Sequence, residues 1–189
     1  MLEGNPRIRR LPITLLVPVG GWIRAGQITA MSRSASTNVQ LVSGGDVLIS
    51  GGGFDTNGGN LLLDPGTSPK AVKPTFNGID ATVGTLSFAS DLSIAINGTT
   101  LGDGTGSTYT QLNVAGVVDL TGVDLLFSGS YVPTLGGEVF TIVANDGTDA
   151  IVGTFTGLAE GATISNFRGS GLNARISYVG GTGNNDVVL

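Results

Sequence analysis

A short acidic stretch around residue 145 carries the side chains best suited to hold a metal ion. Asn145, Asp146 and Asp149 lie within five residues and offer carboxylate and amide oxygens, which are ligands that Ca²⁺ prefers. Their spacing, N-D-G-T-D, departs from the calcium-loop pattern D-x-[DN]-x-[DN]-G, and Asn-Asp-Gly is also typical of a tight turn. We therefore expect a turn between two buried strands, Phe140–Val143 and Ile151–Phe155, with a calcium site as the alternative.

The C-terminal segment resembles a second calcium pattern. Residues 180–188, GGTGNNDVV, fit the nonapeptide G-G-x-G-x-D-x-U-x except that Asn185 stands at the aspartate position. In that architecture the ion lies between stacked copies of the repeat, and the sequence has one imperfect copy. A hairpin or corner turn is the expected structure.

Two pairs of acids could in principle cleave a glycosidic bond, which requires two carboxyl groups facing one bond. The pairs are Asp119 with Asp124 and Asp146 with Glu160. The sequence around them does not indicate a substrate cleft, since Trp22 lies far away in the chain and the three tyrosines are scattered. We assign no catalytic residue.

The chain has neither cysteine nor histidine. This excludes a thiol nucleophile, a Ser-His-Asp relay, an imidazole base and a zinc site built from Cys or His. Only carboxylate chemistry remains, so we expect a protein without enzymatic activity and without a cofactor, calcium being the one candidate.

Charge divides the chain into a basic head and an acidic body. Residues 1–33 carry five arginines against one glutamate, whereas the rest carries four basic residues against thirteen acids, a net charge of −9. An acidic body repels nucleic acid. The apolar run Leu11–Val19 in the head suggests either an export segment or a first strand, and no run approaches the roughly 20 apolar residues of a membrane-spanning helix.

The remaining sequence reads as short strands separated by turn residues. Glycine accounts for 32 of 189 residues and only 12% are charged, and interior glycines disfavour long helices. Strand-like runs lie at 39–42, 46–50, 60–64, 85–96, 111–120, 123–129, 138–144, 150–155 and 174–179. The pattern predicts an all-β fold.

Two all-β architectures fit these runs, a β-solenoid and an antiparallel β-sandwich. The segments GGDVLIS (44–50) and GGNLLLD (58–64) repeat one pattern fourteen residues apart, and aromatic residues make up only 6% of the chain. Short aliphatic strands suit narrow stacked coils better than the space between two sheets. We therefore favour a solenoid, with roughly 20 to 25 residues per coil.

Residues 92–189 resemble the C-terminal module of large bacterial surface proteins. The matching segments are INGTT, YTQLNVAGVVDL, FTIVANDGTDAIVGTFTGLAEGA and ISYVGGTGNNDVVL. The proteins concerned are autotransporter-associated β-strand-repeat and filamentous-haemagglutinin-like proteins. The resemblance implies a right-handed parallel β-helix, export to the cell surface or beyond, and an adhesive or structural role without catalysis.

These observations define a set of expectations. A head at 1–36 precedes a β-solenoid body at 37–189, of which 92–189 is the end module. The expected function is an extracellular or cell-surface adhesin-like module that associates through its solenoid ends or with a surface glycan, and binds neither nucleic acid nor membrane. A carbohydrate-binding or carbohydrate-cleaving β-helix and a calcium-stabilised secreted module are the alternatives.

Overall fold

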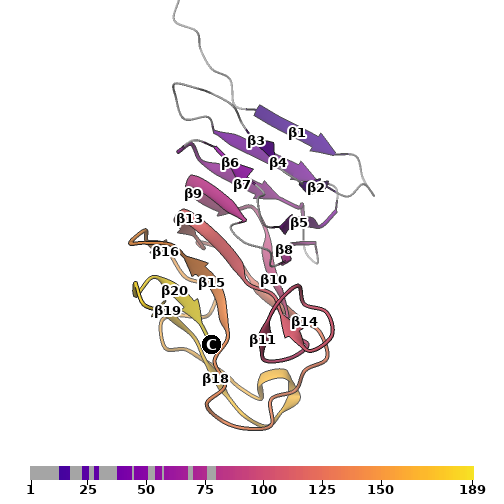
Figure 1. Cartoon of the computed structure of the whole chain (residues 1–189), viewed down its shortest axis with the longest axis vertical. Helices are drawn as coiled ribbons and strands as arrows, with labels where there is room; N and C mark the ends of the chain where they lie inside the picture. The colour runs from indigo at the N-terminus through magenta and orange to yellow at the C-terminus, as the bar shows by residue number, and fades with distance from the viewer. Residues whose placement is uncertain are drawn as a thin grey trace, which may run out of the picture.

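The computed structural model describes residues 38–43, 45–50, 54–56, 58–67, 70–75 and 80–189, together with the strand backbones at 13–17, 23–25 and 28–29. In this part of the chain the regular elements are β-strands and one short 3₁₀ turn, η1 (Phe167–Gly169). Figure 1 shows the strands stacked one above another from β1 to β15. The predicted all-β class is confirmed.

Within the described residues, two large sheets contain most of the strands. The main path of the first sheet runs through β1 (Ile13–Val17), β4 (Val39–Ser43), β7 (Leu61–Asp64), β9 (Ala81–Phe88), β13 (Leu112–Asp119), β15 (Thr141–Asn145), β20 (Asp186–Val188) and β19 (Ser177–Gly180). Three short strands pair beside this path: β3 (Ile28–Thr29), β6 (Phe54–Asp55) and β16 (Ile151–Val152). The second sheet runs through β2 (Ile23–Ala25), β5 (Val47–Ser50), β8 (Ala71–Thr75), β10 (Asp91–Ala95) and β14 (Leu125–Ser128).

The chain alternates between the sheets, so that each passage adds one level to both. Every pairing from β1 to β16 within these two sheets is parallel. We call each level a rung. Because parallel neighbours stand in register, equivalent residues of successive rungs form columns.

Columns of aliphatic side chains fill the interior between the sheets. Backbone register places Ile13, Val39, Leu61, Leu86, Val118 and Ile151 in one column. Leu61, Leu86 and Val118 are fully buried. Short strands with alternating burial, such as β4 and β7, direct every second side chain into this core, and apolar burial of this kind is the main stabilising contribution.

A sharp bend in the first sheet depends on glycine. β9 and β13 lose register between Ala115 and Val117, and Gly116 at that point has φ +131°. A Cβ atom on Gly116 would lie 2.0 Å from the carbonyl oxygen of Val83 on the preceding rung. Only glycine permits both this backbone conformation and the close approach of two rungs.

Spacing between rungs departs from the predicted 20 to 25 residues toward the C-terminus. Val39 pairs with Leu61, 22 residues later, whereas Leu92 pairs with Leu125, 33 residues later. Two excursions account for the difference: residues 97–111, which contain β11 (Thr100–Leu101) and β12 (Thr108–Tyr109), and residues 129–139. The predicted spacing is therefore wrong for the C-terminal rungs, because turn-rich sequence there leaves the stack rather than bending it.

Residues 153–189 form a structure that we call the C-terminal cap. Its strands are β17 (Thr163–Ile164), β18 (Ala174–Arg175), β19 and β20, and all of their pairings are antiparallel. β20 lies along β15, the last strand of the parallel series, and in Figure 1 the cap occupies the lower end of the molecule. The predicted turn at 180–188 is confirmed as the β19–β20 hairpin.

Rings join the cap to the last rungs. Phe167 of the cap contacts Phe127 of β14 edge to face, with ring centroids 5.2 Å apart, and Phe140 contacts Tyr109 in the same manner at 5.2 Å. Phe155, which is fully buried, lies 6.1 Å from the ring of Tyr178. Such aromatic pairs contribute about 0.5–1.5 kcal/mol each beyond their buried area, so the cap is packed firmly on the stack.

The predicted division of the chain is only partly visible. Most of the head at 1–36, including its basic residues 7–10, lies outside the described residues, and only the strand backbones β1, β2 and β3 are placed there. β1 and β2 extend the two sheets of the body by one rung. In this respect the head contributes a first set of strands.

Candidate functional site

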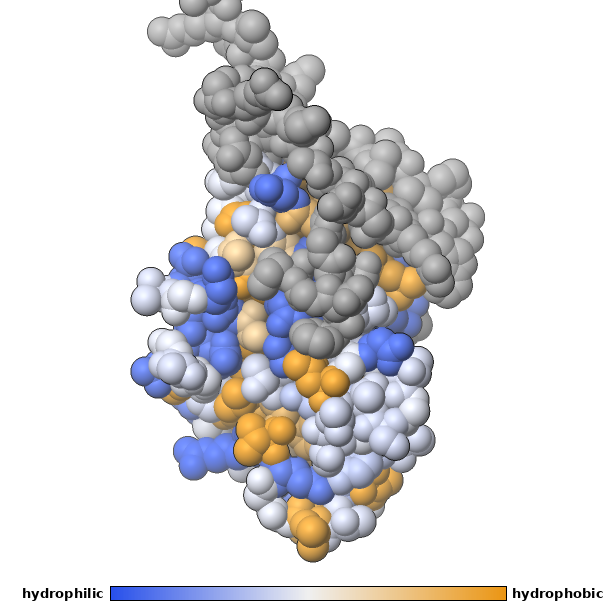
Figure 2. Space-filling model, in the orientation of Figure 1, coloured by the Kyte–Doolittle hydropathy of each residue, from blue (hydrophilic) through white to orange (hydrophobic). Residues whose placement is uncertain are grey.

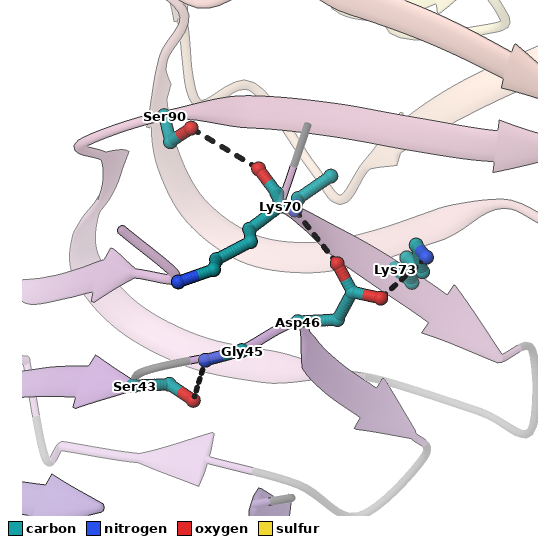
Figure 3. A network of polar contacts seen from close by, with 7 residues as sticks. Ser43, Gly45, Asp46, Lys70, Lys73 and Ser90 are labelled. Atoms are coloured by element: carbon teal, nitrogen blue, oxygen red, sulfur yellow. Dashed lines mark hydrogen bonds and ion pairs between the residues drawn. The ribbon is translucent and has the colours of Figure 1, made fainter. Parts of the chain in front are cut away.

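A polar column connects three rungs at the corner where the chain enters the second sheet (Figure 3). Asp46 accepts hydrogen bonds through its two carboxylate oxygens, from the Ala71 backbone N–H at 2.9 Å and from Lys73 Nζ at 2.5 Å. On the next rung, the Ser90 hydroxyl donates to the carbonyl oxygen of Lys70 at 3.2 Å. These side chains fix the vertical register of neighbouring turns.

The charge of Asp46 is stabilised by its position. Partial burial raises its pKa, but the hydrogen bonds from Lys73 and Ala71 and the positive charges of Lys73 and Lys70 outweigh this effect, and the pKa of Asp46 is lowered. Both members of the ion pair keep solvent contact, at 40% and 23% of their side-chain surface. The column therefore serves alignment more than strength, since exposed ion pairs contribute about 0–1 kcal/mol.

A second polar pair lies inside the stack. The backbone N–H of Asp80 donates to the carbonyl oxygen of Asn113 at 2.9 Å, and the backbone N–H of Asn113 donates to Asp80 Oδ2 at 2.8 Å. Asp80 is fully buried, and burial raises its pKa to about 7. Asp80 Oδ1 and Asn113 Nδ2 are both buried without a hydrogen-bond partner. This pair is a candidate for proton-dependent stability.

The structure places the predicted calcium residues at the last parallel rung. Asn145 ends an inward column that begins with Ile28, Phe54, Ala81 and Val114. It is buried, and its Nδ2 donates to the carbonyl oxygen of Asp149 at 2.9 Å. The side chains of Asp146 and Asp149 are exposed. Among the described residues, no three acidic, His or Cys side chains come together to hold a metal, so carboxylates alone do not make the predicted site.

The two calcium-like segments of the sequence meet in space. Asn185 Nδ2 donates to the carbonyl oxygens of Asp146 at 3.3 Å, Gly147 at 3.3 Å and Asp149 at 3.1 Å. The neighbouring Asp186 accepts the Asn145 backbone N–H through Oδ1 at 2.9 Å. Sequence reasoning treated the loop and the tail separately. The substitution of Asn for Asp at position 185 was the available signal, because an amide can donate to carbonyl groups.

The expected turn at 145–149 is present, but its flanking strands differ from the prediction. β15 and β16 both pair in parallel with β13, on successive parts of that strand, rather than with each other. The second strand ends at Val152, and Phe155 belongs to the cap core. The loop thus turns the chain around a corner of the stack instead of closing a hairpin.

The predicted acid pairs serve the backbone. Asp119 accepts the Thr121 backbone N–H at 3.0 Å, as in a turn that follows a strand. Glu160 accepts the Tyr178 backbone N–H at 2.6 Å and so holds β19 in the cap. Neither pair lines the cavity described below.

A cavity of about 270 Å³ lies between the cap and the 129–139 excursion. Leu135, Val139 and Phe167 contribute its apolar wall, and Glu138 and Arg175 are its charged residues. Leu135 and Val139 are 71% and 66% exposed. Across the face drawn in Figure 2, hydrophobic residues are interspersed with hydrophilic ones over the described surface rather than joined into one band.

The aromatic side chains do not form a sugar-binding surface in the part of the chain that the structure describes. All six phenylalanines and three tyrosines of this part are buried or half-buried. An exposed row of rings, on which sugar faces stack, is absent from these residues. The rings instead belong to the core and the cap.

Comparison with known proteins identifies no relative: no family model, no curated protein and no solved structure matches this chain. In the described residues, none of the helical segments has the length and apolar character needed to cross a bilayer. The function must therefore be argued from the geometry of the chain itself.

Proposed function

We propose that this protein is a non-enzymatic structural module of the cell surface or extracellular space, built as a right-handed parallel β-helix that displays and spaces its neighbours. The observation that carries the proposal is the in-register parallel stack of short strands, alternating between two sheets and ending in an antiparallel cap. Crossovers between parallel strands of one sheet are right-handed in almost all proteins, which supports the handedness.

The distribution of polar groups supports a structural role. Asp46, Asp119 and Glu160 each accept a backbone N–H in the stack or the cap, so these acids stabilise the fold and do not gather around a cavity. The resemblance of residues 92–189 to the end modules of bacterial surface proteins points the same way. A repeated stack that contacts only its neighbours is suited to reach rather than to enclosing a substrate.

Association with other copies is part of the proposal, and it involves the N-terminal end of the stack. At the other end, β20 pairs with β15, and Thr156 of the cap donates its backbone N–H to the carbonyl oxygen of Val123 at 2.9 Å. Pairing of this kind protects strand edges from a second chain. Among the described strands, β1 and β2 are the ones that end the two sheets at the N-terminal side.

Two measurements test this function. The purified chain should neither bind nor hydrolyse the members of a panel of polysaccharides and glycans, and turnover of any of them would overturn the structural role. In intact cells of its source, an epitope placed in the exposed 102–107 turn should be accessible to antibody without permeabilisation. Signal that appears only after permeabilisation would exclude display at the surface.

A further inference from the structure

The 145–149 loop presents more oxygen atoms than hydrogen-bond donors. Three backbone carbonyl oxygens, from Asp146, Gly147 and Asp149, converge on the single Nδ2 atom of Asn185 at 3.1–3.3 Å. An amide NH₂ group has only two hydrogens, and these distances exceed the usual value of about 2.9–3.0 Å. Asn185 therefore satisfies the three carbonyl groups incompletely.

An unpaired oxygen points to the same conclusion independently. Asn145 is 7% exposed, and its Oδ1 is buried without a hydrogen-bond partner. Nδ2 of the same amide donates to the carbonyl oxygen of Asp149, which also accepts from Asn185. The unpaired oxygen thus belongs to the same cluster, where an unsatisfied buried acceptor costs about 1–3 kcal/mol.

Charge at this corner is negative and uncompensated. Asp146 and Asp149 flank the loop, and Asp186 reaches the Asn145 backbone N–H through Oδ1. The ion pair recorded for the described residues is that of Lys73 with Asp46, on a different corner of the stack. None of the three aspartates of the loop and hairpin takes part in it.

We propose that the 145–149 loop and the β19–β20 hairpin together form a Ca²⁺ site. The ligands are the loop carbonyl oxygens, the side-chain oxygens of Asn145 and Asn185, and the carboxylate of Asp186. Rotation of the Asn185 amide about its last torsion exchanges Nδ2 for Oδ1, so that the residue changes from donor to ligand. Calcium accepts six to eight such oxygens in flexible geometry.

The predicted affinity is low because only one carboxylate joins the neutral oxygens. Sites with few charged ligands have dissociation constants of about 10⁻⁴–10⁻³ M. Mg²⁺ should bind more weakly, because it requires a smaller octahedral shell and dehydrates reluctantly. Binding would fasten the cap hairpin to the last parallel rung, which is a role independent of the function proposed above.

The test uses the full chain after treatment with a chelator. Ca²⁺ at 5 mM should raise the melting temperature, and a titration followed by NMR should shift the side-chain amide signals of Asn145 and Asn185. Mg²⁺ at the same concentration should produce smaller changes in both measurements. Asp186→Asn keeps an oxygen that can accept the Asn145 N–H but lacks the charge, and it should weaken binding at least tenfold.

Asp119→Asn is the matched control, since it removes one carboxylate from a turn on another part of the stack and should leave calcium binding unchanged. If neither the melting temperature nor the two amide signals respond to 10 mM Ca²⁺, a water molecule rather than a cation satisfies Asn145 Oδ1 and the proposal is overturned. Equal responses to Ca²⁺ and Mg²⁺, or an unchanged response in Asp186→Asn, would reduce the effect to general ionic screening and overturn it as well.

Discussion

Asp80 and Asn113 exchange backbone and side-chain hydrogen bonds across two neighbouring rungs, at 2.9 and 2.8 Å, in an environment from which solvent is excluded. The burial that isolates the pair also raises the pKa of Asp80 to about 7, and the groups that act on this pKa are Asn113 and burial itself, with no charged neighbour. Neutral Asp80 is the form that the folded protein accommodates best.

The first prediction concerns pH. Because the folded-state pKa of Asp80 is raised above that of the unfolded chain, its contribution to stability is fully present below about pH 4 and is lost as pH rises through about 7. Asp80→Asn keeps an acceptor for Asn113 and should abolish this loss. Urea midpoints from pH 5 to 8 should fall in the wild type, by at most about 1.4 kcal/mol per pH unit, and stay level in the variant. Parallel slopes for the two proteins would show that Asp80 is not the titrating group.

The second prediction separates register from ion pairing in the polar column. Asp46→Ala removes the acceptor for both Ala71 and Lys73 and should lower the free energy of unfolding by about 1–2 kcal/mol. Lys73→Met removes the partly exposed ion pair alone and should cost less than about 1 kcal/mol, with a smaller effect in high salt. Urea denaturation at low and high ionic strength compares the two. An equal cost for both variants would mean that the bond to Ala71 contributes nothing.

The third prediction concerns the bend in the first sheet. Gly116→Ala should destabilise the protein by roughly 3 kcal/mol or more, because a Cβ there meets the Val83 carbonyl oxygen and the φ of +131° is unfavourable for alanine. Gly136→Ala is the control, since its Cβ would meet no atom within 4 Å, and it should be nearly neutral. Thermal denaturation measures both. A tolerated Gly116→Ala would show that the two rungs can separate at the bend at little cost.

The fourth prediction concerns the cap. Phe155→Ala empties a fully buried site beside Tyr178 and should cost about 3–5 kcal/mol. Val179→Ala, at a position 57% exposed in β19, should change stability by less than about 0.5 kcal/mol. Loosening the cap also exposes the edge of β15, so Phe155→Ala should aggregate faster, as light scattering would show. Unchanged aggregation despite lost stability would mean that β15 stays covered by β20.

Sequence patterns located most of the stack because each strand is a local event. Runs such as 39–42 and 111–120 coincide with β4 and β13, since alternating or continuous aliphatic residues bounded by glycine specify a strand without information from elsewhere. β8 was missed because it contains Pro74. The ladder between β8 and β10 involves only Ala71 and Val72, so the missing N–H of Pro74 lies beyond it and is tolerated.

Long-range features could not be predicted from one sequence. That Asn185 meets the loop at Asp146 depends on how the cap folds back over the last rung, a contact across 39 residues. The buried Asp80 likewise looks like an ordinary turn residue until the neighbouring rung covers it. Local composition carries no information about such coverings.

The direction of the backbone hydrogen bonds gives the stack an unusual mechanical character. Because successive strands such as β4 and β7 pair in parallel along the long axis, a pulling force along that axis stretches one layer of bonds at a time. Layers would peel in sequence at modest force instead of shearing together, and the molecule would lengthen in steps. The antiparallel closure at the far end, with its packed rings, would be the last element to absorb the load.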